Sequence, residues 1–459
     1  MSAERVGRPT YVAAGCLAVA VFIAAIVVAA TSSGRHGRTT APTPTATTPV
    51  ASTGLTFGVF GTGPELAAYR SIVATYNRTA AAPVQLRTYA DAAALETAVT
   101  ASTGAPDVYL LPRSGLAQVM AAHRNRPVQE LLSDRGISLG DDYSRDAVTA
   151  FSADDDLQCM PYTVSPMVIY YNTDLIDLDA MRRRGMNVPP IDRSSFSLDE
   201  FRVLARYAAR DGDAGLAIDP TLRGLAPFVY SGGGQVFDSA TTPTSLALGR
   251  GSSVSALRST LEILRDARLT LTSSQLDAHS AVEWFERGRV GMIAGFRGLV
   301  PQLRATRGLH FDVLPMPAIG SNRTVGDFTG VCLMAGHPDH LAAAADFLAY
   351  LVGDRAMTTL ARVGSVQPAD LRVAYGAAFQ QPNEQPAHAS VFTETLRNIV
   401  AAPLGVPFDD LETLVDPDLK ALMYQPGDLG DLGQRLDAID LASAKLLGPL
   451  ASASADATP

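Results

Sequence analysis

The sequence predicts an α/β fold of two domains, built around a largely parallel sheet. From Leu55 onward, short apolar runs alternate with amphipathic stretches, and such strand–helix alternation is typical of βαβ units. The 459 residues exceed one ordinary domain and suit two. Hydrophobic residues make up 47% of the chain, which is enough to form packed cores and too many for a disordered protein.

The first part of this pattern contains three strand–helix pairs. In the first predicted helix, Leu66, Ile72 and Val73 recur at helical spacing and supply an apolar face. Period-two or continuous apolar runs mark the strands. We expect strands at 55–60, 84–89 and 107–111, each followed by a helix, at 64–76, 92–101 and 115–122.

Two loops follow predicted strands at the edge where parallel sheets bind ligands. Ligands of such sheets lie in the crevice at the carboxyl ends of the strands. This places Thr62 and Glu65 of the first loop, and Arg113 and Ser114 of the second, among the candidate binding residues. A dinucleotide-binding loop is not predicted, because Leu66 occupies the place of its third glycine.

Beyond Pro161 the pattern becomes richer in helices, and no internal repeat is visible. Apolar periodicity near 3.6 predicts helices, and short β-branched runs between them predict strands. The expected helices span 201–209, 254–267, 281–287, 341–351 and 391–401, and the expected strands 167–171, 290–294, 311–314 and 330–335.

The first 53 residues predict export and tethering. Arg5 and Arg8 precede an uncharged apolar run over 11–30, which is near the length of a membrane-spanning helix. Two alternatives are open, an uncleaved anchor or a signal peptide cleaved near Ala30. The Thr/Pro/Ala-rich stretch 39–53 predicts an extended stalk. The folded part is therefore expected on the extracellular or periplasmic side of the plasma membrane.

Charge and motifs exclude several functions. A net charge of −9 and a pI near 5.3 argue against nucleic-acid binding, which needs a basic surface. The cysteines match no zinc spacing, and no nucleophile elbow, zincin motif or P-loop occurs. We therefore predict no catalytic centre, no metal site and no cofactor. The run 154–156, three aspartates, is interpreted as a solvated turn.

Several segments, in chain order, resemble the extracellular solute-binding proteins of ABC importers, of the maltose-binding type (family 1, sugar-binding). The segments are 160–175 (MPYTVSPMVIYYNTDL), 196–201 (FSLDEF), 231–235 (SGGGQ), 284–295 (WFERGRVGMIAG), 311–317 (FDVLPMP) and 329–351. The resemblance covers about 55–400. The sequence departs from the family at Phe196 and Arg297, where tryptophan is usual.

This resemblance implies a two-lobed periplasmic-binding-protein fold of type II, with hinge strands between the lobes. Lobe I is expected to combine 54–163 with 329–375, and lobe II 164–328 with 376–452; crossings fall near Tyr162, Phe328 and Ala374. The implied function is that of a binding protein, not an enzyme. It would take a small ligand between the lobes and deliver it to an ABC permease.

The resemblance also implies ligand-binding residues. Sugars need aromatic rings for their C–H faces and planar polar groups for their hydroxyls. Each candidate also has an ordinary alternative, such as a surface arginine, a turn residue or a core aromatic. The implied positions, besides Arg113 and Ser114, are Ser165, Tyr230, Gly233, Trp284, Phe296, Arg297, Asp327, Phe328 and Phe392.

By the same resemblance, Cys159 and Cys332 lie on neighbouring hinge strands of lobe I. In an oxidising compartment they are expected to form a disulfide, with two buried free thiols as the alternative.

The ligand class stays open among neutral oligosaccharides, amino sugars, sugar acids and sugar phosphodiesters. Two other functions remain alternatives: a secreted carbohydrate-active hydrolase or lyase, and a tethered sensing module without transport. Glu65, Asp91 and Asp327 are the carboxylates considered for an enzyme.

Overall fold

The computed structural model describes residues 54–456, except for 102, 211 and 426. The predicted export segment and stalk, 1–53, lie outside the described residues. Within the described part, no helix combines the length and the hydropathy needed to cross a membrane. The signal or anchor at the N-terminus therefore stays a prediction.

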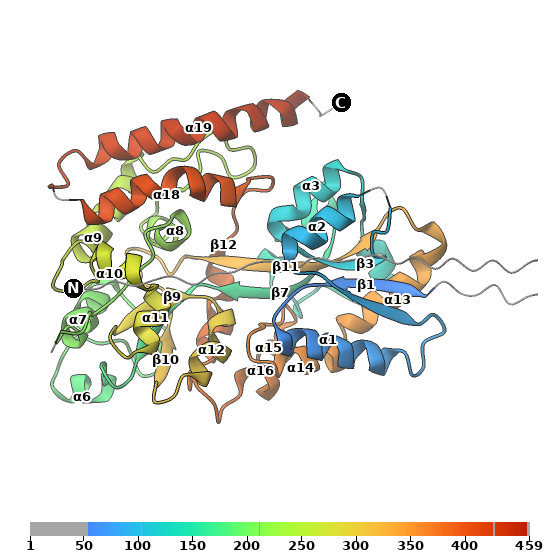
Figure 1. Ribbon diagram of the computed structural model, residues 1–459, viewed down its shortest axis with the longest axis horizontal. Helices are drawn as coiled ribbons and strands as arrows, with labels where there is room; N and C mark the ends of the chain where they lie inside the picture. The colour runs from blue at the N-terminus through green and yellow to red at the C-terminus, as the bar shows by residue number, and fades with distance from the viewer. Residues whose placement is uncertain (1–53, 102, 211, 426, 457–459) are drawn as a thin grey trace, which may run out of the picture. The chain divides into compact units, whose positions relative to one another are not determined.

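The larger sheet forms lobe I. Its seven strands are β1 (Leu55–Val59), β2 (Val84–Thr88), β3 (Val108–Pro112), β4 (Asn125–Arg126), β7 (Met160–Pro166), β11 (Thr324–Met334) and β12 (Ile399–Val400). Five of them follow the order β12-β11-β3-β1-β2, and β4 and β7 also pair with β11. β1 is parallel to β2 and β3, as predicted. The sheet is mixed, however, because β11 runs antiparallel to β3 and β7 (Figure 1).

Local signals explain where the helices of lobe I begin. At the start of α1 (Gly63–Tyr76), Thr62 and Glu65 form a capping box, and Pro64 stands in the first turn, where its missing N–H costs nothing. Buried Ile72 and Val73 turn one face of α1 toward the core. The other helices are α2 (Ala92–Thr100), α3 (Leu116–Ala121), α4 (Gln129–Ser133), α5 (Arg145–Ala150), α13 (Leu341–Leu351), α14 (Asp354–Ala361), α15 (Leu371–Ala374) and α16 (Ala377–Gln380).

Lobe II is built on a smaller antiparallel sheet. Its strands, β8 (Val168–Asn172), β9 (Met292–Gly295) and β10 (Phe311–Leu314), follow the order β10-β8-β9. Side chains of β8 alternate between two cores: Tyr170 belongs to the core shared with lobe I, whereas Ile169 and Tyr171 belong to a second core.

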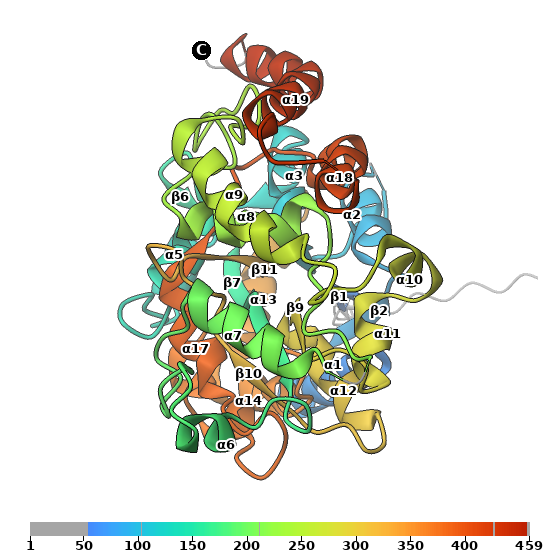
Figure 2. The ribbon, with the colours of Figure 1, turned by 90° about the vertical axis from the view of Figure 1, so that its left-hand side faces the viewer.

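Helices surround this smaller sheet and extend to the end of the chain. α18 and α19 lie beside α8 and α9 in both views (Figures 1 and 2). The helices are α6 (Leu178–Arg183), α7 (Leu198–Ala208), α8 (Leu222–Ser231), α9 (Gly251–Leu264), α10 (Ser273–Ala278), α11 (Ala281–Glu286), α12 (Val300–Ala305), α17 (Ser390–Thr395), α18 (Phe408–Tyr424) and α19 (Leu432–Asp456).

Two long strands connect the lobes. β7 and β11 pair from Gly326↔Pro166 to Val331↔Met160, and only Met167 separates β7 from β8 of lobe II. β11 spans 11 residues and begins six residues before the predicted strand at 330–335. These strands form the hinges that the resemblance implied near Tyr162 and Phe328.

A disulfide joins Cys159 to Cys332 where the two hinge strands enter lobe I. Cys332 lies within β11, and Cys159 directly precedes β7. Both side chains are fully buried. The bridge closes a loop with a sequence separation of 173 residues, which contains most of lobe II.

The local predictions fail in one place and hold in another. The helix expected over 391–401 is wrong in its second half: α17 ends at Thr395, and residues 399–400 form β12. The backbone of β12 instead pairs with Thr324 and Val325 of β11, a long-range contact that local periodicity does not reveal. The turn predicted at 154–156 is confirmed, because Asp154 and Asp155 have positive φ between the paired strands β5 (Ser152–Ala153) and β6 (Asp156–Leu157).

Candidate functional site

A cavity of about 330 Å³ lies where the end of β3, one side of α8, the hinge strand β11 and the segment 400–408 meet. Its volume suits a small molecule. Polar, aromatic and aliphatic side chains line it. The polar or charged ones are Arg113, Ser114, Arg223, Asp327 and Thr329, and the aromatic ones are Tyr230, Phe237, Phe296, Phe328 and Phe408.

An ion pair in the cavity lining joins α8 to the hinge strand β11. Nη1 of Arg223 lies 2.6 Å from Oδ1 of Asp327, and the two side chains keep 36% and 51% of their surface exposed. Partial desolvation by the surrounding protein raises the pKa of the Asp327 carboxyl, and the Arg223 guanidinium opposes that rise. Glu412 of α18 accepts a 3.0 Å hydrogen bond from the Arg223 backbone N–H. The pair thus offers a donor and an acceptor side by side, both accessible to a ligand.

Aromatic rings flank this pair. The Arg223 guanidinium carbon lies 5.1 Å from the ring centroid of Phe408 and 6.0 Å from that of Phe296. Both distances suit cation–π contacts, which orient the guanidinium. Burial raises the pKa of Tyr230, so its hydroxyl is protonated at neutral pH. The rings provide apolar faces next to charged groups, the combination that sugar recognition needs.

Arg113 is fixed by backbone carbonyls. Its Nε donates to Ala150 O at 2.9 Å, and its Nη1 donates to Ala402 O in the segment 400–408. Burial lowers the pKa of Arg113 to about 10, but this is still well above neutral pH, and the side chain therefore stays charged. Ser114 is exposed at the same rim of the cavity.

The structure brings six of the candidate residues together around the cavity. They come from lobe I, lobe II and the hinge strand, and 215 positions separate the first from the last (328 − 113). They are Arg113, Ser114, Tyr230, Phe296, Asp327 and Phe328. Whether each contacts a ligand stays a prediction.

Thr62 and Glu65 do not line the cavity, and both carboxylate oxygens of Glu65 already accept hydrogen bonds. One Glu65 carboxylate oxygen accepts the Thr62 backbone N–H at 2.7 Å, within the capping box. The other accepts a hydrogen bond from the Ser365 hydroxyl at 2.5 Å. Glu65 therefore connects the start of α1 with the loop that contains Ser365.

Arg297 lies in the protein interior, and it is fully buried. Its Nε donates to Gly364 O at 2.7 Å, and its Nη2 donates to Phe379 O at 3.2 Å. Its guanidinium carbon also lies 5.1 Å from the ring centroid of Phe392, another fully buried candidate. Burial lowers the pKa of Arg297 to about 10. These contacts assign Arg297 and Phe392 a structural role.

The remaining three candidates also lie outside the cavity lining. Ser165 accepts a 2.8 Å hydrogen bond from the Arg297 backbone N–H. The Trp284 indole N–H donates to Gln275 O at 3.0 Å. Gly233 follows α8 and has a φ of +77°. Residues with a side chain rarely adopt this backbone conformation, which explains why a glycine stands here.

Sequence reasoning missed Arg223, Phe237 and Phe408. One signal in the sequence could have drawn attention to Arg223: Thr221 is a helix N-cap, and it marks the start of α8 two residues earlier. Phe408 lies beyond the region of resemblance, so no motif indicated it.

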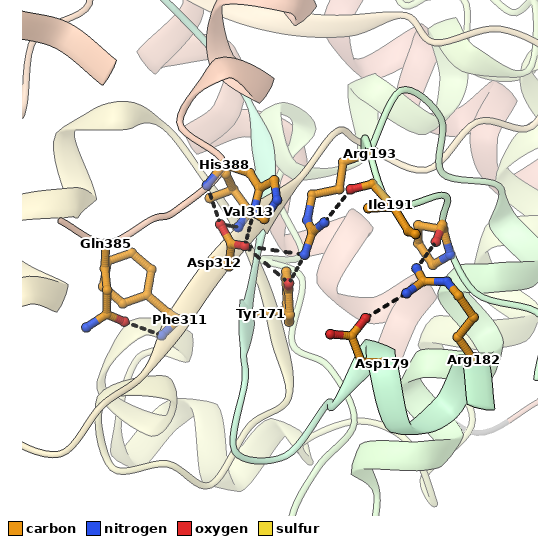
Figure 3. A network of polar contacts seen from close by, with 11 residues as sticks. Tyr171, Asp179, Arg182, Ile191, Arg193, Phe311, Asp312, Val313, Gln385 and His388 are labelled. Atoms are coloured by element: carbon orange, nitrogen blue, oxygen red, sulfur yellow. Dashed lines mark hydrogen bonds and ion pairs between the residues drawn. The ribbon is translucent and has the colours of Figure 1, made fainter. Parts of the chain in front are cut away.

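A second polar cluster lies in lobe II (Figure 3), and none of its residues lines the cavity. Asp312 of β10, only 5% exposed, accepts hydrogen bonds from the His388 backbone N–H at 3.0 Å and from the Tyr171 hydroxyl at 3.4 Å. Nη2 of Arg193 lies 3.5 Å from the same carboxylate. Burial, reinforced by Asp312, raises the pKa of Tyr171. The cluster holds the segment around His388 and the loop around Arg193 against the sheet.

Comparison with known proteins gives the family. Residues 41–387 match the model of the bacterial extracellular solute-binding proteins. Sequence comparison with curated proteins finds no match.

Among solved structures, this chain is similar to the substrate-binding protein Lmo0181 of Listeria monocytogenes in complex with cycloalternan (16% identity, TM-score 0.69, covering 86% of this chain and 98% of that one). It is also similar to the GacH receptor of Streptomyces glaucescens, solved unliganded and with acarbose (17% identity, TM-score 0.67, covering 86% of this chain and 98% of that one). A third similar structure is UgpB of Mycobacterium tuberculosis with glycerophosphocholine (14% identity, TM-score 0.65, covering 86% of this chain and 99% of that one). These likenesses show the two-lobed fold. Together with the matched segment, which exceeds half of the chain, they lead to one conclusion: the chain belongs to the bacterial extracellular solute-binding protein family.

Proposed function

We propose that this protein binds a sugar or sugar derivative in the cavity beside the hinge and delivers it to an ABC permease. The observation that carries the proposal is the Arg223–Asp327 pair, open to the cavity and flanked by Phe296 and Phe408. A hydroxyl both donates and accepts, so adjacent cationic and anionic groups can bind it from two sides. Rings beside them can stack on the C–H faces of a sugar ring.

The charge balance of the cavity supports a polyhydroxyl ligand over a strongly anionic one. Asp327 neutralises Arg223 across 2.6 Å, and backbone carbonyls already accept hydrogen bonds from Arg113. Arg297 gives no support for an anionic ligand, because it does not line the cavity. Sugars and glycerophosphocholine are the ligands of the similar structures, so both classes belong in any test.

The position of the carboxylates favours binding over hydrolysis. A glycosidase needs two carboxylates across the scissile bond. Among the described residues that line the cavity, Asp327 is the single carboxylate, and it is paired with arginine. Asp91 instead caps α2 by accepting the Ala94 backbone N–H at 2.8 Å, and Glu65 holds Ser365.

A thermal-shift screen of the full chain tests the proposal. The panel contains neutral oligosaccharides, amino sugars, sugar acids and glycerophosphodiesters. A ligand at a hundred times its dissociation constant is expected to raise the free energy of unfolding by about 2.7 kcal/mol. Stabilisation without release of products supports a binding protein, whereas turnover of a glycan would support the hydrolase alternative. Delivery is tested by uptake of the identified ligand in cells with and without the gene.

Replacing Arg223 with alanine is expected to weaken binding of the identified ligand ten- to a hundredfold. The change removes a charged donor and leaves Asp327 without its partner, which corresponds to a loss of about 1.5–3 kcal/mol. Isothermal titration calorimetry measures the change. The matched control is Arg268→Ala in lobe II, where the arginine pairs with Asp266 and keeps 83% of its surface exposed. Equal affinity of Arg223→Ala and the control would contradict the proposed site.

A further inference from the structure

A cluster of one aspartate and two histidines lies in lobe I, outside the site described above. Oδ1 of Asp107 is 2.7 Å from Nδ1 of His337 and 2.7 Å from Nδ1 of His340. One potential ligand atom from each of the three residues lies within 4.8 Å of the others. Imidazole nitrogen and carboxylate oxygen are ligands that Zn²⁺ prefers, at about 2.0–2.2 Å, so small side-chain movements bring all three onto one ion.

The backbone explains why the two rings converge. His337 precedes the short 3₁₀-helix η3 (Pro338–His340), and His340 ends it. Residues three apart in a 3₁₀-helix point the same way, because this helix has three residues per turn. The turn joins the end of β11 to α13, and Asp107 directly precedes β3, the neighbour of β11 in the sheet. Segments separated by 230 residues thus meet at this point.

A second layer of contacts fixes the carboxylate. Oδ2 of Asp107 accepts hydrogen bonds from both the backbone N–H and the hydroxyl of Thr56, each at 2.7 Å. This leaves Oδ1 facing the histidines. Such outer hydrogen bonds orient metal ligands and hold their geometry. Asp107 is 4% exposed, whereas the side chains of His337 and His340 are 38% and 28% exposed, so an ion and water ligands can reach the cluster from solvent.

We propose that Asp107, His337 and His340 bind a divalent transition-metal ion, for which Zn²⁺ is the best match. The ion would clamp the turn before α13 to the start of β3 in lobe I. Pro112, at the other end of β3, lines the ligand cavity, about 16 Å away at the rise of a strand. Metal binding therefore does not rest on the proposed transport function, and it is expected to leave ligand affinity unchanged.

Titration of the metal-free full chain with ZnCl₂, followed by calorimetry, tests the site. We expect one Zn²⁺ per chain at this site and a higher melting temperature with Zn²⁺, since an ion that binds the folded state stabilises it. His337→Ala and His340→Ala are each expected to weaken Zn²⁺ binding at least tenfold. Thr56→Val is expected to weaken it about tenfold through loss of the outer hydrogen bond. The absorption spectrum of the Co²⁺ form checks nitrogen and oxygen coordination.

The matched control is His310→Ala. His310 also lies beside a carboxylate, at 3.0 Å from Asp174, but as a single exposed histidine in lobe II. This variant is expected to bind Zn²⁺ as the unchanged protein does. Zn²⁺ binding that is equal in the unchanged protein and in the His337→Ala/His340→Ala double variant would overturn the proposal. Because both histidines are partly exposed, circular dichroism is expected to show that the double variant folds.

Discussion

Replacing Cys159 and Cys332 together with alanine is expected to lower the free energy of unfolding by about 3–5 kcal/mol. The bridge closes a loop with a separation of 173 residues, so it restricts the unfolded chain strongly. It also joins the hinge strands where both enter lobe I. Urea denaturation of the unchanged and the double-variant chain measures the difference, and addition of a reductant to the unchanged protein is expected to reproduce most of it.

The matched control for this prediction is Cys16→Ala. Cys16 lies in the predicted export segment, outside the described residues. Its replacement is expected to leave the free energy of unfolding within about 0.5 kcal/mol of the unchanged value. A double variant as stable as the Cys16→Ala control would show that the bridge does not stabilise the fold.

Arg297→Ala is expected to destabilise the protein by about 3–5 kcal/mol, because it removes a buried charged side chain and its hydrogen bonds. The carbonyls of Gly364 and Phe379 lose their donors, and the space beside the Phe379 and Phe392 rings is left unfilled. Arg297→Lys is expected to be nearly as damaging, because an ammonium lacks the planar fork that reaches two carbonyls. Chemical denaturation measures both changes.

The control for this prediction is Arg70→Ala, at an exposed position of α1, with an expected change within about 0.5 kcal/mol. If folded Arg297→Ala kept its stability but lost ligand binding, the residue would act at the ligand site, as the family resemblance had implied. Loss of stability, with unchanged affinity in the remaining folded protein, supports the interior role.

The sequence predicts the first half of lobe I well because its signals are local. The capping residues Thr62 and Glu65, the proline at position 64 and the spacing of Ile72 and Val73 all indicate the same helix. Long-range pairing is harder to predict. β12 consists of only two residues, and it forms a strand because it pairs with β11, some 75 positions earlier in the chain (399 − 324).

The candidate site is predicted in part for the same reason. Loops that follow strands, such as the one with Arg113 and Ser114, can be placed from the order of elements alone. Arg223 was not predicted as a lining residue because its role depends on Asp327, which is 104 positions away in the sequence. Arg297 was expected at the ligand because the family resemblance implied that position, but the resemblance does not reveal which way a side chain points, and here it is fully buried. Family resemblance indicated the region of the candidate site. Side-chain contacts were needed to distinguish the residues that line the cavity from those that have a structural role.

The central claim, that this cavity is the ligand site, is tested most directly by calorimetric titration of the screened ligand into Ser114→Trp. Ser114 is exposed at the rim, so the larger side chain is expected to fold normally and to block the cavity. Ser255→Trp, at an exposed position of α9, is the matched control. The account predicts no detectable binding to Ser114→Trp and full binding to Ser255→Trp. Unchanged affinity in Ser114→Trp would contradict it.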